Sequence, residues 1–284
     1  MLRLRTAITT ILVVLSHAII SLSGLPAYAQ ARLEAQYGIT MTGVAIGKIV
    51  WRVEIGNDLY ATSANGKASR VLSILISGEG SLSTSGKIEN GQMAPTYFSS
   101  SIFDEDGKTE LQVIFAAGIS KETVIQEPPR KHKLIPLDDA DRRGVTDPLS
   151  AMLISTNARD GAMESANCNR ILPIFDGRRR YNLVLTYKRM DNVKSEHGYS
   201  GPVLVCGAIL QPIGGYRADS VIFRYVAGKS DIEFWFAPIT GTSVMAPIQM
   251  IVPTLIGTLK IQADQFEAVA LSTLDFPQPS ASPR

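Results

Sequence analysis

The sequence is poor in the side chains that most often hold metal ions. It contains only two cysteines and three histidines among 284 residues. His132 and His197 stand far apart, and neither has a cysteine or a second histidine at metal-site spacing. The turn Asp104-Glu105-Asp106-Gly107 begins like a calcium loop but lacks the third acidic ligand and the distal glutamate. We therefore predict no metal site and no cofactor.

The sequence also carries almost no net charge. Its 28 basic residues exceed its 26 acidic residues by two, and Arg3 and Arg5 near the N-terminus account for that excess. Nucleic-acid-binding proteins attract phosphate backbones through surplus basic side chains, and polybasic segments attach proteins to anionic lipid in the same way. The composition therefore argues against a nucleic-acid partner and gives no support to a polybasic membrane surface.

No apolar run is long and uninterrupted enough to span a bilayer, which requires roughly 20 residues. The longest run outside the N-terminus, residues 244–261, is broken by Pro247, Pro253 and Gly257. Such a segment is typical of buried strands and turns rather than of a lipid-facing helix. We expect no transmembrane segment in the mature chain.

The N-terminus has the three parts of an export signal. Arg3 and Arg5 precede an apolar run over residues 8–22, and Pro26 stands before the small-x-small site Ala27-Tyr28-Ala29. A membrane anchor is the alternative, but the run is short and interrupted by serine and histidine. We interpret residues 1–29 as a cleavable signal peptide and expect a periplasmic protein.

Cys168 and Cys206 are the only cysteines, and both follow the predicted signal peptide. An even number of cysteines in an exported chain favours a disulfide. The alternative is a buried free thiol at Cys206, which would leave Cys168 exposed to oxidation. We predict a bond that ties a polar loop to an apolar strand.

Alternating apolar and polar residues dominate the rest of the sequence. Residues 37–42 and 49–55 read as one hairpin, 96–103 and 110–115 as a second, and 171–175 and 181–187 as a third, around Asp176-Gly177. Further strands are expected at 203–210, 221–226, 231–237 and 257–267. We predict a mainly β protein, whose single twisted antiparallel sheet curls into an open or partly closed barrel.

Few helices are expected. Residues 68–76 are ambiguous, because their β-branched side chains also suit a strand, whereas Asp147 and Pro148 are a natural cap and first residue for a helix over 147–154. We expect one antiparallel domain over residues 30–271, in which the polar loop 127–146 joins two halves. The proline-rich residues 272–284 read as a disordered tail.

Several short motifs together resemble a known family. They are Tyr37, Ile39, Gly43 and Gly47 in the first hairpin, the helix start over 147–151, the strand–turn–strand over 174–181 and the aromatic strand over 232–236. The sequence resembles, over residues 36–267, the exported bacterial family catalogued as domain of unknown function 3108. The resemblance implies an envelope protein of mainly antiparallel β structure without an assigned activity, and it carries over no catalytic or ligand-binding residues. The cysteine pair is not typical of that family.

No catalytic constellation is visible. His197 and Ser200 share a loop, but the strand–turn–helix elbow that exposes a nucleophilic serine is missing. Asp138, Asp139 and Asp141 lie in a charged loop without apolar neighbours that would raise a carboxyl pKa. We therefore expect no enzymatic activity.

Two sets of residues remain as candidate binding sites. Arg178, Arg179 and Arg180 are a candidate anion contact, although solvated charges that protect a strand edge account for them as well. An incompletely closed sheet would leave an apolar groove, and the alternative is a solid core. The residues expected to line such a groove are Trp51, Phe115, Phe234 and Phe236.

The sequence thus favours a non-catalytic envelope protein that binds a lipid-like or other amphipathic molecule. One alternative is an envelope hydrolase or glycan-modifying enzyme whose carboxylates meet only in the folded chain. Another is a scaffold for envelope protein assembly, which would contact its partners through the charged loop or an exposed sheet edge.

Overall fold

The computed structural model describes residues 30–68, 78–104, 107–128, 133–156, 163–229 and 231–271. The predicted signal peptide, almost all of the predicted helix over 68–76, His132 and the predicted tail lie outside the described residues. Within the described ranges, no helix has the length and apolar character needed to cross a membrane.

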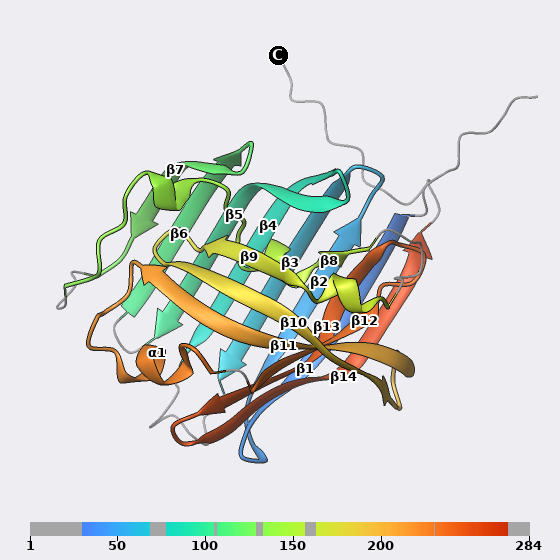
Figure 1. Ribbon diagram of the computed structural model, residues 1–284. Coiled ribbons are helices and arrows are strands. Elements are labelled where there is room, and N and C mark those ends of the chain that lie inside the picture. The colour runs from blue at the N-terminus through green and yellow to red at the C-terminus, as the bar shows by residue number, and fades with distance from the viewer. Residues whose placement is uncertain are drawn as a thin grey trace, which may run out of the picture.

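The described residues form one 14-stranded antiparallel sheet (Figure 1). Its first half contains β1 (Gln30–Met41), β2 (Val44–Ile55), β3 (Leu59–Ala68), β4 (Glu79–Glu89), β5 (Gln92–Asp104), β6 (Gly107–Ala116) and β7 (Ile119–Gln126). Its second half contains β8 (Ile154–Ser155), β9 (Arg170–Phe175), β10 (Arg180–Val193), β11 (Gly201–Gly214), β12 (Ile232–Pro238), β13 (Val244–Thr254) and β14 (Gly257–Leu271).

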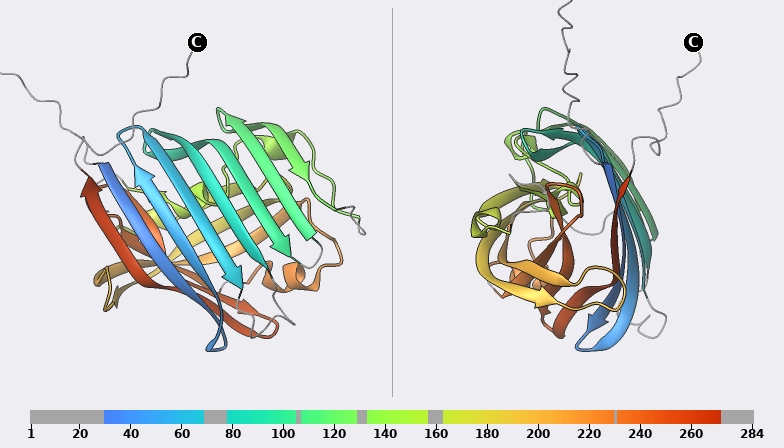
Figure 2. Two further views of the ribbon diagram at one scale, coloured as in Figure 1. Left: turned by 180° about the vertical axis from the view of Figure 1, so that it is seen from behind. Right: turned by 90° about the vertical axis from the view of Figure 1, so that its right-hand side faces the viewer.

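The sheet consists of two meanders, β1 to β7 and β9 to β14, which are joined where β1 pairs with β14. From edge to edge the strand order reads β7-β6-β5-β4-β3-β2-β1-β14-β13-β12-β11-β10-β9, and the short β8 pairs with β13. β1 and β14 pair over nearly their whole lengths, from Gln30 opposite Leu271 to Met41 opposite Leu259. The twist of so many strands curls the sheet around its apolar face, as the right-hand view of Figure 2 shows.

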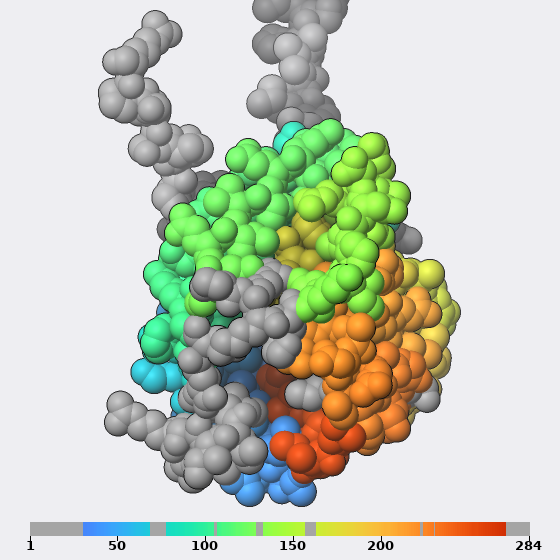
Figure 3. All heavy atoms as spheres, turned by 90° about the vertical axis from the view of Figure 1, so that its left-hand side faces the viewer, coloured from blue at the N-terminus to red at the C-terminus, as the bar shows by residue number. Residues whose placement is uncertain are grey.

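A short segment of the predicted polar loop lies between the two edges of the sheet. Arg143 forms a bridge with Ile119 of β7, and Thr146 forms a bridge with Ile174 of β9. The Thr146 N–H donates to the Pro173 carbonyl at 2.8 Å, and the Phe175 N–H donates to the Thr146 carbonyl at 2.8 Å. Figure 3 shows the yellow-green atoms of this part of the chain between green atoms of the first half of the sheet and orange atoms of the second half. Residues 143–147 therefore nearly close the barrel, and we call them the closing loop.

The seam between the two edges is also packed with apolar side chains. Val145 joins a buried cluster with Phe98, Leu111 and Val113 of the first half and Phe175 of β9. The turn between β9 and β10 contacts the same strands, because a Cβ atom on Gly177 would lie 2.5 Å from a methyl group of Leu111. Gly177 adopts φ 89°, a conformation that suits glycine.

The three predicted hairpins are confirmed as β1–β2, β5–β6 and β9–β10. The strands predicted at 203–210, 231–237 and 257–267 are confirmed within β11, β12 and β14. β3, β4 and β7 were not predicted, because their inward positions hold threonine, alanine, glycine or serine besides larger apolar residues and the alternation is therefore weak.

Two secondary-structure predictions were wrong. Residues 221–226 form the helix α1 (Val221–Val226) rather than a strand, because a short apolar run fits either structure and no neighbouring strand pairs with it there. The predicted helix over 147–154 is only a 3₁₀ turn, η3 (Ser150–Met152), followed by β8. The Asp147 side chain caps that turn as predicted, but β8 pairs with β13 and ends the helical geometry.

Candidate functional site

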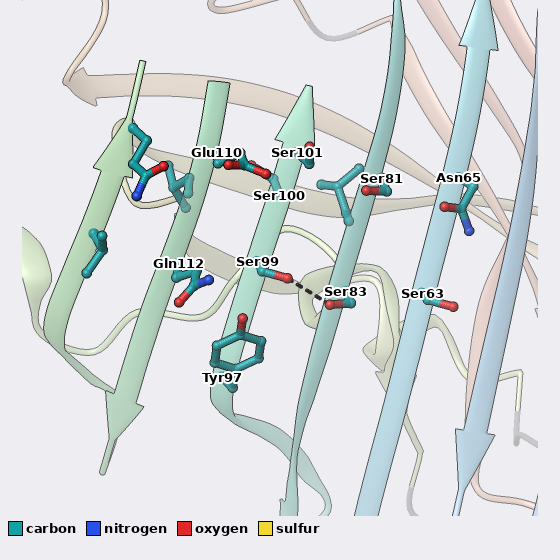
Figure 4. A pocket seen from close by; sticks show the side chains of 14 residues that line it. Ser63, Asn65, Ser81, Ser83, Tyr97, Ser99, Ser100, Ser101, Glu110 and Gln112 are labelled. Carbon is teal, nitrogen blue, oxygen red and sulfur yellow. Dashed lines mark hydrogen bonds between the residues drawn. The ribbon is translucent and has the colours of Figure 1, made fainter. Parts of the chain in front are cut away.

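A groove of about 420 Å³ lies on the outer face of β3 to β7 (Figure 4). Side chains on this face point away from the barrel interior, because their neighbours Thr62, Thr84 and Phe98 are the buried ones. The groove is lined by Ser63, Asn65, Ser81, Leu82, Ser83, Tyr97, Ser99, Ser100, Ser101, Glu110, Leu111, Gln112, Val124 and Gln126.

The strand register arranges most of these side chains in two rows that cross the strands. In one row Ser63 pairs with Ser83, Ser83 with Ser99, and Ser99 with Gln112. In the parallel row Asn65, Ser81, Ser101, Glu110 and Gln126 stand opposite one another in turn. At a spacing of about 4.8 Å between strands, the first row, on four strands, is roughly 14 Å long, and the second row, on five strands, is roughly 19 Å long.

The hydroxyl groups in the rows are close enough to share hydrogen bonds. Ser83 Oγ and Ser99 Oγ lie 2.8 Å apart, as the dashed line in Figure 4 shows. The Glu110 carboxylate forms an ion pair with Lys108 at 2.7 Å. The lining therefore consists mainly of neutral donors and acceptors, and its acidic group has a partner.

The outer face of the neighbouring strands β1 and β2 is different. It carries charged cross-strand pairs, with Arg32 bound to Glu54 at 3.0 Å and Arg52 bound to Glu34 at 3.2 Å. Such charges are the ordinary means of keeping an exposed sheet face soluble. Among the residues that line the groove, by contrast, only Glu110 is charged.

A second polar cluster lies inside the barrel around Asp147, whose exposed fraction is 0%. One carboxylate oxygen accepts the backbone N–H groups of Leu149 and Ser150 at 2.9 and 3.0 Å. The other oxygen accepts the hydroxyl groups of Ser150 and Thr84. The Ser150 hydroxyl also lies 2.5 Å from the Tyr60 hydroxyl, so the cluster joins the closing loop to β3 and β4.

Burial shapes the electrostatics of this interior cluster. It raises the pKa of Asp147 above its ordinary value, while the hydrogen bonds from Ser150 and Thr84 oppose the rise. Burial and the nearby Asp147 carboxyl also raise the pKa of Tyr60. The neutral forms of both groups are therefore favoured in the fold, and the cluster acts as an internal hydrogen-bonded tie.

Of the aromatic residues predicted to line an apolar groove, only Phe234 and Phe236 come together, with their ring centroids 6.1 Å apart. Trp51, Phe115, Phe234 and Phe236 have exposed fractions of 7% or less and belong to three different core clusters. These side chains are therefore buried in the core, and their role in lining an apolar groove stays a prediction. They are buried because the curled sheet fills its interior with side chains from both meanders.

The predicted anion contact consists of arginines that already have acceptors within the protein. Arg178 forms an ion pair with Glu127, and Arg179 donates to Asp176 at 2.8 Å. Arg180 donates to the carbonyl of Tyr181 at 2.7 Å and to Asn182 at 2.8 Å. These arginines support the turn between β9 and β10, and their role as an anion contact stays a prediction.

The other candidate residues are also accounted for by local structure. Cys168 and Cys206 lie at disulfide distance, with sulfur atoms 1.98 Å apart, and both are buried. The Ser200 hydroxyl donates to the carbonyl of Ser195 at 3.1 Å rather than to His197. In the ranges that the structure describes, no group of three histidine, cysteine or acidic residues is arranged to hold a metal ion.

The groove was not predicted, because its lining residues come from five different strands. A local signal was present, since Ser81, Ser83 and Ser85 alternate along β4 and Ser99 and Ser101 alternate along β5. Alternation places each set on one face of its strand. Only the register shows that the sets lie opposite each other.

The fold and its groove define an antiparallel, nearly closed β-barrel with a packed interior and a polar outer site. The chain belongs to the family described as Protein of unknown function (DUF3108), whose model matches residues 36–264. This match confirms the resemblance seen in the sequence. A search of curated proteins gives no match.

One solved structure to which the chain is similar is a β-barrel-like protein of domain of unknown function DUF1849 from Brucella abortus. The TM-score is 0.42 and the sequence identity 8%, and the alignment covers 86% of this chain and 98% of that chain.

Proposed function

We propose that this protein is a non-catalytic binding protein of the bacterial envelope and that the serine-lined groove binds a neutral, hydroxyl-rich chain such as an oligosaccharide. The observation that carries the proposal is the pair of polar rows, in which Glu110 is the single charged side chain, next to the charged outer face of β1 and β2. The export signal in the sequence supports the location in the envelope.

The chemistry of the rows fits a sugar chain. Each serine hydroxyl both donates and accepts hydrogen bonds, and the amides of Asn65, Gln112 and Gln126 do the same. Serine also loses less side-chain entropy on binding than the long charged residues that usually cover a sheet. Tyr97 adds an aromatic ring with a polar tip to the lining, a side chain suited to a partly apolar sugar face.

The groove fits neither glycoside hydrolysis nor a lipid-like ligand, two functions that the sequence left open. Glycoside hydrolysis generally requires two carboxyl groups, whereas Glu110 is the single carboxylate of the lining and is paired with Lys108. A lipid-like ligand requires apolar walls, whereas most side chains that line this groove carry hydroxyl or amide groups. We therefore propose recognition of a polar chain, without its cleavage.

Titration followed by amide NMR tests the proposal. Protein purified from the periplasmic fraction is titrated with neutral tetrasaccharides, and we expect shifts confined to β3 to β7. Ser99→Leu, which replaces a central hydroxyl by a bulky apolar group, is expected to weaken binding about tenfold or more. Thr186→Leu, on an exposed position of β10, is the matched control and is expected to bind normally.

Three outcomes would count against the proposal. They are the absence of shifts with any neutral saccharide, shifts located on other strands, and equal losses in Ser99→Leu and Thr186→Leu. Retention of the protein in the cytosolic fraction would contradict the envelope location.

A further inference from the structure

Two hairpin tips lie side by side at one end of the barrel. One is the turn between β1 and β2, at Thr42 and Gly43, and the other is the turn between β13 and β14, at Leu255 and Ile256. The Thr42 N–H donates to the Thr258 carbonyl at 2.8 Å. Both hairpins project at the lower end of Figure 1 and of the left-hand view of Figure 2. We call the two turns together the paired tip.

The paired tip exposes aliphatic side chains. Leu255 has an exposed fraction of 51% and Ile256 of 62%, and Val44, the first residue of β2 after the other turn, has one of 53%. Single exposed aliphatic residues are common on protein surfaces and need no explanation. Here three of them lie on or next to two turns that are hydrogen-bonded to each other, at the end of the barrel where these strands project.

The sequence around the paired tip is also free of charge. Residues 38–47 and 244–259 contain no Asp, Glu, Lys or Arg. Exposed turns ordinarily carry polar and charged residues, and charge is the usual protection against unwanted association. Its absence from both hairpins indicates that this end of the barrel is adapted to an apolar or interfacial surrounding.

The first charged residue that follows each uncharged segment is a lysine. Lys48 stands opposite Gly38 of β1, and Lys260 stands opposite Thr40 of the same strand. Because Gly38 and Thr40 are two positions apart, both lysines share the outer face. Lys67, which stands opposite Lys48 on β3, is paired with Glu79 at 3.3 Å.

An aliphatic tip with lysines behind it matches the layers of a lipid surface. Aliphatic side chains enter the boundary between headgroups and acyl chains, while lysine side chains extend their ammonium groups to the phosphates. We propose that the paired tip docks this protein on a bilayer that contains anionic phospholipid. This inference is independent of the groove, which lies on the outer face of β3 to β7.

Vesicle co-sedimentation tests this inference with the chain from residue 30 onward, which contains every described strand. The probes are vesicles of equal parts phosphatidylethanolamine and phosphatidylglycerol, and vesicles of phosphatidylcholine alone. We expect binding to the anionic vesicles that weakens at high salt. The double variant Leu255→Ser/Ile256→Ser is expected to lower the partition coefficient about tenfold or more.

The matched control is Leu59→Ser, because Leu59 is 59% exposed and begins β3 at the opposite end of the barrel. This variant is expected to bind vesicles like the wild type. Lys48→Ala/Lys260→Ala is expected to reduce binding to anionic vesicles and to leave the weak binding to phosphatidylcholine unchanged. Circular dichroism of each variant checks that the sheet is intact.

Three results would overturn the inference. The first is a wild-type chain that binds neither kind of vesicle, and the second is vesicle binding that is reduced equally by Leu59→Ser and by the tip variant. The third is a wild-type dimer, measured by light scattering, that the tip variant converts to a monomer without any change in vesicle binding. That result would assign the paired tip to a second copy of the chain.

Discussion

Replacement of Asp147 by asparagine or alanine tests how the closing loop is held to the barrel. Asp147 is fully buried, and its oxygens accept two backbone N–H groups and two hydroxyl groups. Asparagine keeps one carbonyl oxygen for the backbone donors of Leu149 and Ser150, and its amide can donate to the hydroxyl of Ser150 or Thr84. Alanine leaves all four donors without this acceptor.

The pH dependence follows from the sign of the pKa shift. Burial raises the pKa of Asp147 above its unfolded value of 3.8. The group therefore contributes its full stability below that unfolded value, and this contribution is lost as pH rises through the folded value. Asparagine does not ionise, so the stability of Asp147→Asn relative to wild type should increase with pH, by at most about 1.4 kcal/mol per pH unit.

The alanine variant gives the size of the hydrogen-bonded tie. Each buried donor left without a partner costs about 1 to 3 kcal/mol, and some of the four donors here find other acceptors, since Thr84 also donates to the Tyr97 carbonyl at 2.8 Å. We expect Asp147→Ala to lose about 3 to 5 kcal/mol of unfolding free energy near pH 4. Alanine does not ionise either, so this loss relative to wild type should shrink as pH rises, in parallel with the change for Asp147→Asn.

Urea unfolding between about pH 4 and pH 8 measures both effects. The other titrating groups are common to wild type and Asp147→Asn, so they cancel in the difference between the two. A difference that stays constant across this range would refute the raised pKa. An alanine variant as stable as the asparagine variant would refute the role of the hydrogen bonds.

Two further predictions concern the second meander. Loss of the bond between Cys168 and Cys206 in the Cys168→Ser/Cys206→Ser variant should reduce the unfolding free energy by up to about 4 kcal/mol, because the bond closes a loop of 38 residues; an unchanged urea midpoint would contradict this. Hydrogen bonds from Arg189, Trp235 and Lys188 lower the pKa of Glu233 to about 2, from 4.5. Because the folded value is the lower one, this stabilisation is present above pH 4.5 and is lost as pH falls toward 2. Glu233→Gln should therefore cost about 1 kcal/mol near neutral pH, a value that allows for solvent screening, and acid titration by NMR of the Glu233 carboxyl should show the low pKa directly.

Local patterns in the sequence were sufficient for the hairpins and for the cysteine pair. Alternation of apolar and polar residues specifies which side chains share a face of a strand, and a tight turn specifies which strands are neighbours. Residues 49–55 illustrate this, since Trp51, Val53 and Ile55 are all buried in β2. The cap formed by Asp147 was also predictable, because it involves residues only two and three positions away.

The features that depend on distant parts of the chain could not be read from local patterns. The pairing of β1 with β14, the bridges made by Arg143 and Thr146, and the contact between Asp147 and Thr84 all join residues far apart in sequence. The core clusters to which the aromatic residues belong could not be read from the sequence for the same reason, because alternation shows that a face is apolar but not which strands cover it.

Whether a feature of this protein could be predicted from its sequence therefore depends on how far apart in the sequence the contacting residues lie. The sequence by itself determined that this chain is a β protein with few chemically reactive groups, since composition and alternation are local properties. Only the tertiary structure decided that serines from three strands stand in cross-strand rows and that two uncharged turns meet at one end. Both arrangements depend on strand register and strand order, which are set by packing of the whole sheet.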